Sequence, residues 1–184
     1  MTWHLVSLDA ATPQPWRNAG GVTRELLTWP GPANWRVRIS VADVQAAGAF
    51  SRFEDVDRWF AVLEGDGVVL HLDGDVHRLA VSDAPFHFHG DAAVHCALVG
   101  GPTRDLNLMA PPGRGRMERV HARLGVHAAA GSLLAVYAHG KPAHVAFHGK
   151  TFDVPPRHLA WTVLAADASG TITGSEALWM EAVP

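Results

Sequence analysis

Short runs of alternating apolar and polar residues, separated by glycine, proline and aspartate, dominate this 184-residue chain. A period of two places successive side chains on opposite faces of a β-strand, whereas helical spacing is hard to find over any useful length. In residues 35–41 the apolar side chains alternate with Arg36, Arg38 and Ser40, so Arg38 and Ser40 point to the same side. The sequence therefore predicts an all-β protein.

Glycine and aspartate turns divide the region from residue 59 to residue 79 into three short apolar runs. Such spacing predicts two successive hairpins, that is, a meander. Two further strands are expected in residues 84–91 and 92–99. The glycines then recur, since Gly65 and Gly74 have counterparts at Gly140 and Gly149, each 75 residues later. This offset predicts an internal duplication.

Two consecutive meanders of short strands indicate two jelly rolls, each able to hold a small ligand at its mouth. The candidate junction is Pro111-Pro112-Gly113-Arg114-Gly115, a composition typical of a linker or long turn. We expect an N-terminal barrel with the ligand pocket in residues 1–112 and a smaller C-terminal barrel in residues 113–184, packed in one compact unit.

Charge and composition argue against several classes of function. The net charge of −3 lacks a basic stripe, which argues against a nucleic-acid partner, and no apolar run approaches the ~18 residues of a membrane span. The N-terminus carries no secretory pattern, so a cytoplasmic location is expected. The single cysteine, Cys96, lies in an apolar run and is expected to be a small buried hydrophobe.

Residues 16–25, Trp-Arg-Asn-Ala-Gly-Gly-Val-Thr-Arg-Glu, combine an aromatic ring, an amide, two glycines, a hydroxyl and an ion-pair-capable Arg/Glu. Adjacent glycines allow positive φ or close approach of a ligand to the backbone. A Gly-Gly turn leading into a strand is the simpler interpretation of the same residues. The segment is thus either a binding loop or a tight turn.

Five blocks in this order resemble the HutD/Ves family: residues 16–25, 35–42, 48–51 with 56–58, 62–67 and 101–109. The resemblance implies a bicupin fold and a link to bacterial histidine utilisation, with no established catalytic chemistry. From about Arg116 onward it rests on architecture. Ala19 stands where family members commonly have glycine.

If the sheet is a cupin barrel, the polar residues of these blocks converge on one pocket for a small carboxylate. Arg38 is the chosen anchor, because a guanidinium presents a planar fork to a carboxylate. Arg58 is the second cation, and Glu25 and Asp105 hold the arginines or accept an amide N–H. The full set of candidate ligand-binding residues is Trp16, Asn18, Gly20, Gly21, Thr23, Glu25, Arg38, Ser40, Arg58, Asp105 and Asn107.

A cupin metal site is the alternative use of such a barrel. His87 and His89 share a strand face and His95 follows, but no glutamate stands at the expected distance. We therefore expect neither a metal nor another cofactor, and no catalytic residue.

Three functions stay open. The favoured one is a non-catalytic protein that binds a histidine-degradation intermediate such as urocanate or formylglutamate and regulates histidine utilisation. The alternatives are a cupin enzyme, either metal-dependent or an acid/base isomerase acting on a small acid, and a protein-interaction module with a vestigial barrel. Exposed strand edges also leave a homodimer open.

Overall fold

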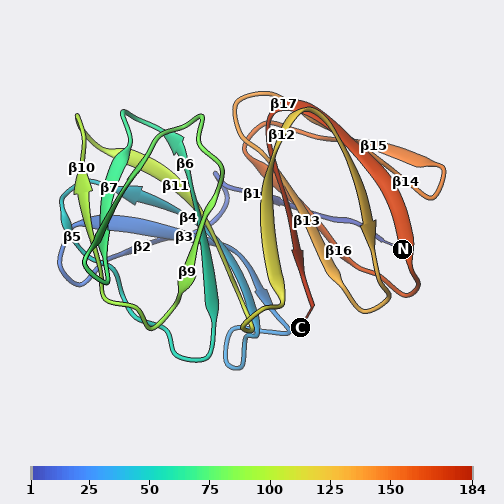
Figure 1. Cartoon of the computed structure of the whole chain (residues 1–184). Helices are drawn as coiled ribbons and strands as arrows, with labels where there is room; N and C mark the ends of the chain where they lie inside the picture. The colour runs from blue at the N-terminus through green and yellow to red at the C-terminus, as the bar shows by residue number, and fades with distance from the viewer. Residues whose placement is uncertain (1, 184) are drawn as a thin grey trace. The chain divides into compact units, whose positions relative to one another are not determined.

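The computed structural model describes residues 2–183, and every regular element in that range is a β-strand (Figure 1). The predicted all-β fold class is confirmed. None of the described residues belongs to a helix long and apolar enough to cross a membrane. The chain separates into two compact units, one formed by Thr12–Gly113 and the other by residues up to Ala11 together with those from Arg114 onward.

The junction at residues 113–114 lies one residue from the boundary that the linker composition indicates. The expected division placed the N-terminal residues in the N-terminal barrel. In the structure they belong to the other unit, because β1 (His4–Ser7) pairs antiparallel with β16 (His158–Val163). Backbone pairing with a distant strand leaves no local sequence signal.

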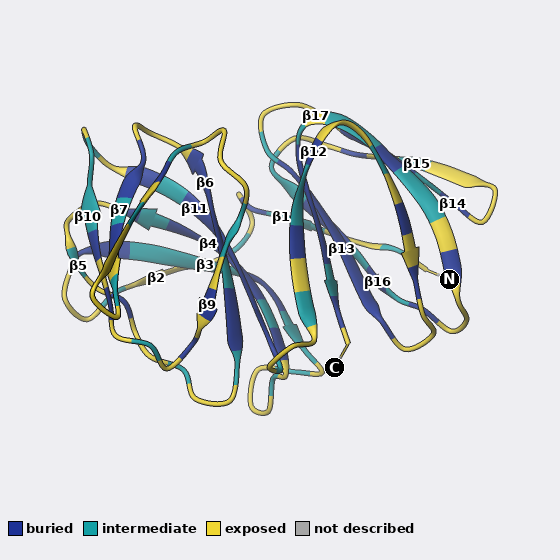
Figure 2. Cartoon of the chain, in the orientation of Figure 1, coloured by how far each residue is buried: buried dark blue, intermediate teal, exposed yellow. Residues whose placement is uncertain are grey.

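Two sheets build the unit of residues 12–113. The larger has six strands, in spatial order β2 (Pro13–Pro15), β3 (Gly21–Trp29), β4 (Val37–Val44), β11 (Thr103–Ala110), β6 (Asp57–Glu64) and β9 (Phe86–His89). The smaller has four, in spatial order β5 (Gly48–Ala49), β10 (Val94–Leu98), β7 (Val68–Leu72) and β8 (Asp75–Leu79). One hydrophobic cluster joins Phe60 and Val62 of β6 to Leu70 of β7 and Cys96 of β10, so the core lies between the two sheets. The central strands are buried over most of their length (Figure 2).

One expected hairpin is absent from this unit. The strands β7 and β8 form the predicted hairpin, but β6 pairs with β11 and β9 and not with β7. The prediction of a β6–β7 hairpin is wrong, because the turn between them carries the chain from one sheet to the other. Gly65 and Gly67 make this corner at φ values of +96° and +102°, and a Cβ at Gly67 would lie 2.3 Å from the carbonyl oxygen of Leu79. Only glycine adopts such positive φ values without strain and also leaves room for that carbonyl oxygen.

The 75-residue offset is visible in the strands themselves. Strands β7 and β8 begin at residues 68 and 75, and their counterparts β14 (Ala143–Phe147) and β15 (Lys150–Val154) begin at residues 143 and 150 with the same lengths. The two hairpins therefore repeat in length and spacing, as the glycine pattern predicts.

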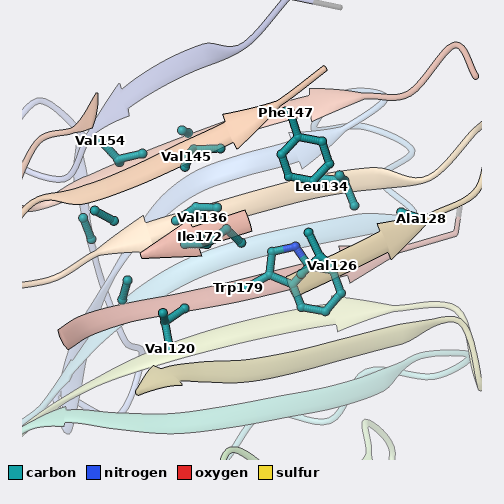
Figure 3. Packing of buried hydrophobic residues seen from close by; sticks show 14 of the residues in the cluster. Val120, Val126, Ala128, Leu134, Val136, Val145, Phe147, Val154, Ile172 and Trp179 are labelled. Carbon is teal, nitrogen blue, oxygen red and sulfur yellow. The ribbon is translucent and has the colours of Figure 1, made fainter. Parts of the chain in front are cut away.

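The other unit has a seven-stranded sheet in the order β1-β16-β13-β17-β14-β15, with β12 paired to β17. Its remaining bounds are β12 (Gly115–Ala128), β13 (Leu133–Ala138) and β17 (Ala168–Ala182). Large side chains fill its interior: Figure 3 shows Trp179 and Phe147 among Leu134, Val126 and Ile172, all buried. This unit therefore closes over a packed hydrophobic core.

Candidate functional site

A cavity of about 520 Å³ lies within the unit of residues 12–113. Its floor comes from β3, β4, β11 and β6, and the segments 14–18 and 49–53 line its remaining sides. Seven of the eleven predicted site residues line it: Trp16, Asn18, Thr23, Arg38, Ser40, Arg58 and Asn107. Residues as far apart in the chain as Trp16 and Asn107 therefore share one concave surface.

Strand register explains this convergence. Met109 of β11 stands opposite Arg38 of β4 on one side and Arg58 of β6 on the other. Two residues back along β11, Asn107 stands opposite Ser40. Since alternate residues share a face, all five side chains project toward the cavity. The predicted common orientation of Arg38 and Ser40 is confirmed.

Arg58 is the most deeply buried cation of the site, with 6% of its surface exposed. Its Nε and Nη2 donate hydrogen bonds to Oδ1 of Asn107 at 2.9 and 2.7 Å, and its Cζ lies 4.5 Å from the centroid of the Phe50 ring. Burial lowers the pKa of Arg58 to about 10, the charge of Arg38 acts in the same direction, and the charge of Asp105 opposes both. The guanidinium is thus still a cation at neutral pH. No carboxylate among the described residues forms an ion pair with it.

Arg38 lies closer to solvent. Its Nη2 lies 3.3 Å from Oε1 of Glu25, and its Cζ lies 5.6 Å from the centroid of the Phe53 ring. Glu25 itself does not line the cavity. It therefore orients Arg38 from the side, which is one of the roles predicted for it.

The segment of Trp16 and Asn18 is held by short-range contacts. The Trp16 Nε1 donates to Oγ1 of Thr23 at 2.7 Å, and the Gly20 N–H donates to Oδ1 of Asn18 at 3.0 Å. Gly20 and Gly21 do not line the cavity, but their lack of a side chain leaves room for Asn18 and Trp16, which do. A Cβ at Gly21 would lie 2.6 Å from the carbonyl oxygen of Asp43 and 3.2 Å from the Trp16 ring.

Asp105 is fully buried and lies outside the cavity lining. Its Oδ2 accepts a hydrogen bond from Thr103 Oγ1 at 2.9 Å, while its Oδ1 has no hydrogen-bond partner among the described residues. Burial raises the pKa of Asp105 to about 7, although the Thr103 hydrogen bond and the Arg58 charge oppose that rise. Burial, followed by the charge of Asp105, also raises the pKa of the nearby Cys96 thiol to about 12. The expected buried state of Cys96 is confirmed, since its exposed fraction is 0%.

Several lining residues are absent from the predicted set, notably Arg17, Phe50, Phe53 and Met109. Arg17 and Phe50 lie inside the family-like blocks of the sequence and were available as candidates on that ground. Met109 also lies inside such a block, whereas Phe53 lies outside all of them, and an apolar residue beside a turn is common in any core.

The three histidines considered for a metal site are divided between the two sheets. His95 lies on β10 of the small sheet, opposite His71, whereas His87 and His89 lie on β9 of the large sheet. Both β9 histidines contact Asp57, His87 through Nε2 at 3.2 Å and His89 through Nδ1 at 2.9 Å. Within residues 2–183 no group of three or more His, Cys, Asp or Glu side chains is arranged to hold a metal ion. Asp57 also accepts the backbone N–H of Gly113 at 2.8 Å, so it ties β6 to the end of this unit.

The strand topology of the two units defines a cupin-fold protein of the two-barrel class, with a cavity in one barrel. The same fold occurs in oxalate decarboxylase from Bacillus subtilis, with a TM-score of 0.61, 8% identity, and coverage of 96% of this chain and 76% of that one. This likeness concerns the fold alone.

The HutD family model matches residues 9–180, and the chain belongs to the HutD family. An uncharacterized 21.2 kDa protein in the hutC 3′ region of Pseudomonas putida is 40% identical over 106 residues, which are 55% of this chain. The match spans only 55% of the length of that relative.

Two solved structures cover almost the whole chain. A conserved protein of unknown function from Pseudomonas aeruginosa has a TM-score of 0.84 and 29% identity, covering 99% of this chain and 97% of that one. HutD from Pseudomonas fluorescens, solved under a formate condition, has a TM-score of 0.82 and 27% identity, covering 98% of this chain and 97% of that one.

Proposed function

We propose that the unit of residues 12–113 binds a small carboxylate, and that the chain acts as a non-catalytic regulator of histidine utilisation. The observation that carries this proposal is the state of Arg58, a buried cation held in place by a neutral amide. Burying a charge is costly unless an opposite charge compensates it. An anionic ligand at Arg58 would supply that compensation.

The geometry around Arg58 supports a carboxylate in particular. A guanidinium forms paired, charge-assisted hydrogen bonds with a carboxylate, and these gain strength where water is scarce. Asn107 occupies only Nε and one N–H of Nη2, which leaves other guanidinium donors for a ligand. The Ser40 hydroxyl faces the same space and adds a further polar contact.

The non-catalytic role is supported by the kinds of side chain that line the cavity. Within the described chain this lining has no aspartate, glutamate, histidine or cysteine. Those residue types supply most general acids, bases and nucleophiles. The link to histidine utilisation rests on the family and on the P. putida relative in the hutC 3′ region.

Thermal unfolding with and without ligand tests the proposal. Urocanate, N-formyl-L-glutamate and formate would be added to the wild type, to Arg58→Gln and to Arg36→Gln, where Arg36 is an exposed arginine outside the cavity. A ligand at 100 times its Kd stabilises the native state by about 2.7 kcal/mol, which corresponds to a Tm increase of about 5–10 °C. We expect the increase for at least one compound, a much smaller one in Arg58→Gln and a full one in Arg36→Gln. No increase with any carboxylate would refute the proposal.

A further inference from the structure

A buried carboxyl lies beside the cavity without lining it. Asp105 has an exposed fraction of 0% and lies on the same face of β11 as Asn107, two residues away. Its Oδ2 accepts a hydrogen bond from Thr103 Oγ1 at 2.9 Å, whereas its Oδ1 has no hydrogen-bond partner among the described residues. A buried carboxylate with one bare oxygen is costly, so this position favours the protonated carboxyl.

Asp105 is embedded in the hydrophobic core between the two sheets. Ala42 of β4 and Val62 of β6 stand directly opposite it on the neighbouring strands, and both belong to the cluster that fills this core. Neither side chain can solvate a carboxylate. Charges act more strongly in such surroundings than in water, because the surroundings screen them weakly. Asp105 therefore responds to changes of charge in the cavity beside it.

Four ionisable groups surround Asp105 electrostatically. The charge of Arg58 favours the ionised carboxylate and that of Asp43 disfavours it. Arg58, with a pKa of about 10, and Arg38, a second guanidinium that acts on it, both stay cationic at neutral pH. The pKa of Asp43 is lowered by its hydrogen bonds to arginines, and that of Cys96 is raised to about 12 by burial. Burial raises the pKa of Asp105 to about 7, so of these five groups it is the one that titrates between pH 6 and pH 8.5.

Resting on the proposed carboxylate site, we propose that Asp105 takes up a proton from solvent when an anion binds at Arg58, and that its protonation state sets the affinity of the cavity. Without ligand, the Arg58 charge partly compensates an ionised Asp105. A bound anion cancels that charge. Because the guanidinium is bonded to Asn107, the anion would stand roughly 7–10 Å from the Asp105 carboxylate and repel it. Asp105 thus acts on the ligand through Arg58 and does not touch it.

Calorimetric titration over a range of pH tests this inference. N-formyl-L-glutamate and formate are the probes, because their carboxyl groups stay ionised from pH 6 to pH 8.5. We expect the Kd for the wild type to be about tenfold lower at pH 6 than at pH 8.5. At pH 7.5, titrations in phosphate and in Tris, which release protons with different enthalpies, should report the uptake of a fraction of a proton on binding.

Two variants separate the titration of Asp105 from a structural role. Asp105→Asn should bind with the same Kd at both pH values, close to that of the wild type at pH 6, and without proton uptake. Thr103→Val removes the hydrogen bond that favours the ionised carboxylate, so its affinity should begin to fall at a higher pH than in the wild type. Asp91→Asn, at an exposed position outside the cavity, is the matched control and should keep the tenfold change.

The outcomes separate this inference from the proposed function. Binding without proton uptake and with the same Kd at both pH values would overturn the coupling and leave the carboxylate site standing. An equal pH dependence in the wild type and in Asp105→Asn would also overturn it, because another group would then bind the proton. If Asp105→Asn does not fold, an unshifted pH profile in Thr103→Val has the same meaning. Failure of both compounds to bind the wild type at pH 6 would overturn both proposals.

Discussion

Arg58 donates two hydrogen bonds to one oxygen, Oδ1 of Asn107, and the pair lies on neighbouring strands of the large sheet. The amide fixes the guanidinium without neutralising it. A carboxylate at the same position would fix it and cancel its charge. Because residue 107 is an asparagine and not an aspartate, the positioned Arg58 cation stays available to a ligand.

Asn107→Asp should abolish ligand binding while the protein stays folded. The new carboxylate has the shape of the amide and would pair with Arg58 internally, so an external anion would no longer gain that contact. The ligand-induced Tm increase should fall to near zero. Asn34→Asp, the same change at an exposed position outside the cavity, is the control and should keep the increase. Full retention in Asn107→Asp would contradict the role assigned to Arg58.

Asp105→Asn should change how stability depends on pH. The native pKa of Asp105 is raised to about 7 from an ordinary value of 3.8, so the folded state binds an extra proton between these values. Its contribution to stability therefore falls as pH rises from about 4 to about 7. An asparagine removes this loss and keeps a hydrogen-bonding group near Thr103.

The measurement for Asp105 is the Tm difference between Asp105→Asn and the wild type at pH 5 and at pH 8. The difference should be smaller at pH 5, where the wild-type carboxyl is still protonated in the native state. At pH 8 the variant should be more stable, by an amount on the order of 1–4 kcal/mol. Asp91→Asn, at an exposed position, should show no such change. A difference that does not grow with pH would be inconsistent with a neutral Asp105 in the native state.

Gly21→Ala should destabilise the unit and weaken ligand binding together. The added Cβ meets backbone at the Asp43 carbonyl oxygen, which cannot move without disturbing β4, and it presses on the Trp16 ring. We expect a loss of about 1–3 kcal/mol in the free energy of unfolding, measured by urea titration. At Gly31, a Cβ would have no atom within 4 Å, so Gly31→Ala should be close to neutral. Equal effects at the two positions would argue against the close contact.

Ala19→Gly should stabilise the protein, the reverse of the usual effect of this substitution. Ala19 has a φ of +55°, a left-handed conformation that is costly for any residue with a Cβ. Glycine adopts this conformation without that cost. The expected gain is about 0.5–1 kcal/mol, after the larger entropy loss of glycine is subtracted. Ala47→Gly, at an exposed position without positive φ, should be neutral or destabilising in the same urea titration.

The candidate site was predictable where local pattern and family resemblance coincide. The alternation in residues 35–41 placed Arg38 and Ser40 on one face, and both line the cavity. Arg58 and Asn107 were candidates from separate blocks, but nothing local indicated that they would bond each other. Asp105 was assigned to the pocket by the same reasoning, but it lies beyond the cavity lining, two residues from Asn107 on the same face of β11.

The sequence by itself determined the all-β class, the strands within residues 35–41 and 68–79, and the 75-residue repeat. These features depend on side-chain alternation and backbone conformation within a few residues. Only the tertiary structure shows that β6 and β7 belong to different sheets and that β1 pairs with β16. It alone also shows that Asp57 contacts both His87 and His89. Such pairings depend on which distant strands come into register, and their free energy comes from burial and hydrogen bonding between segments that are far apart in the chain.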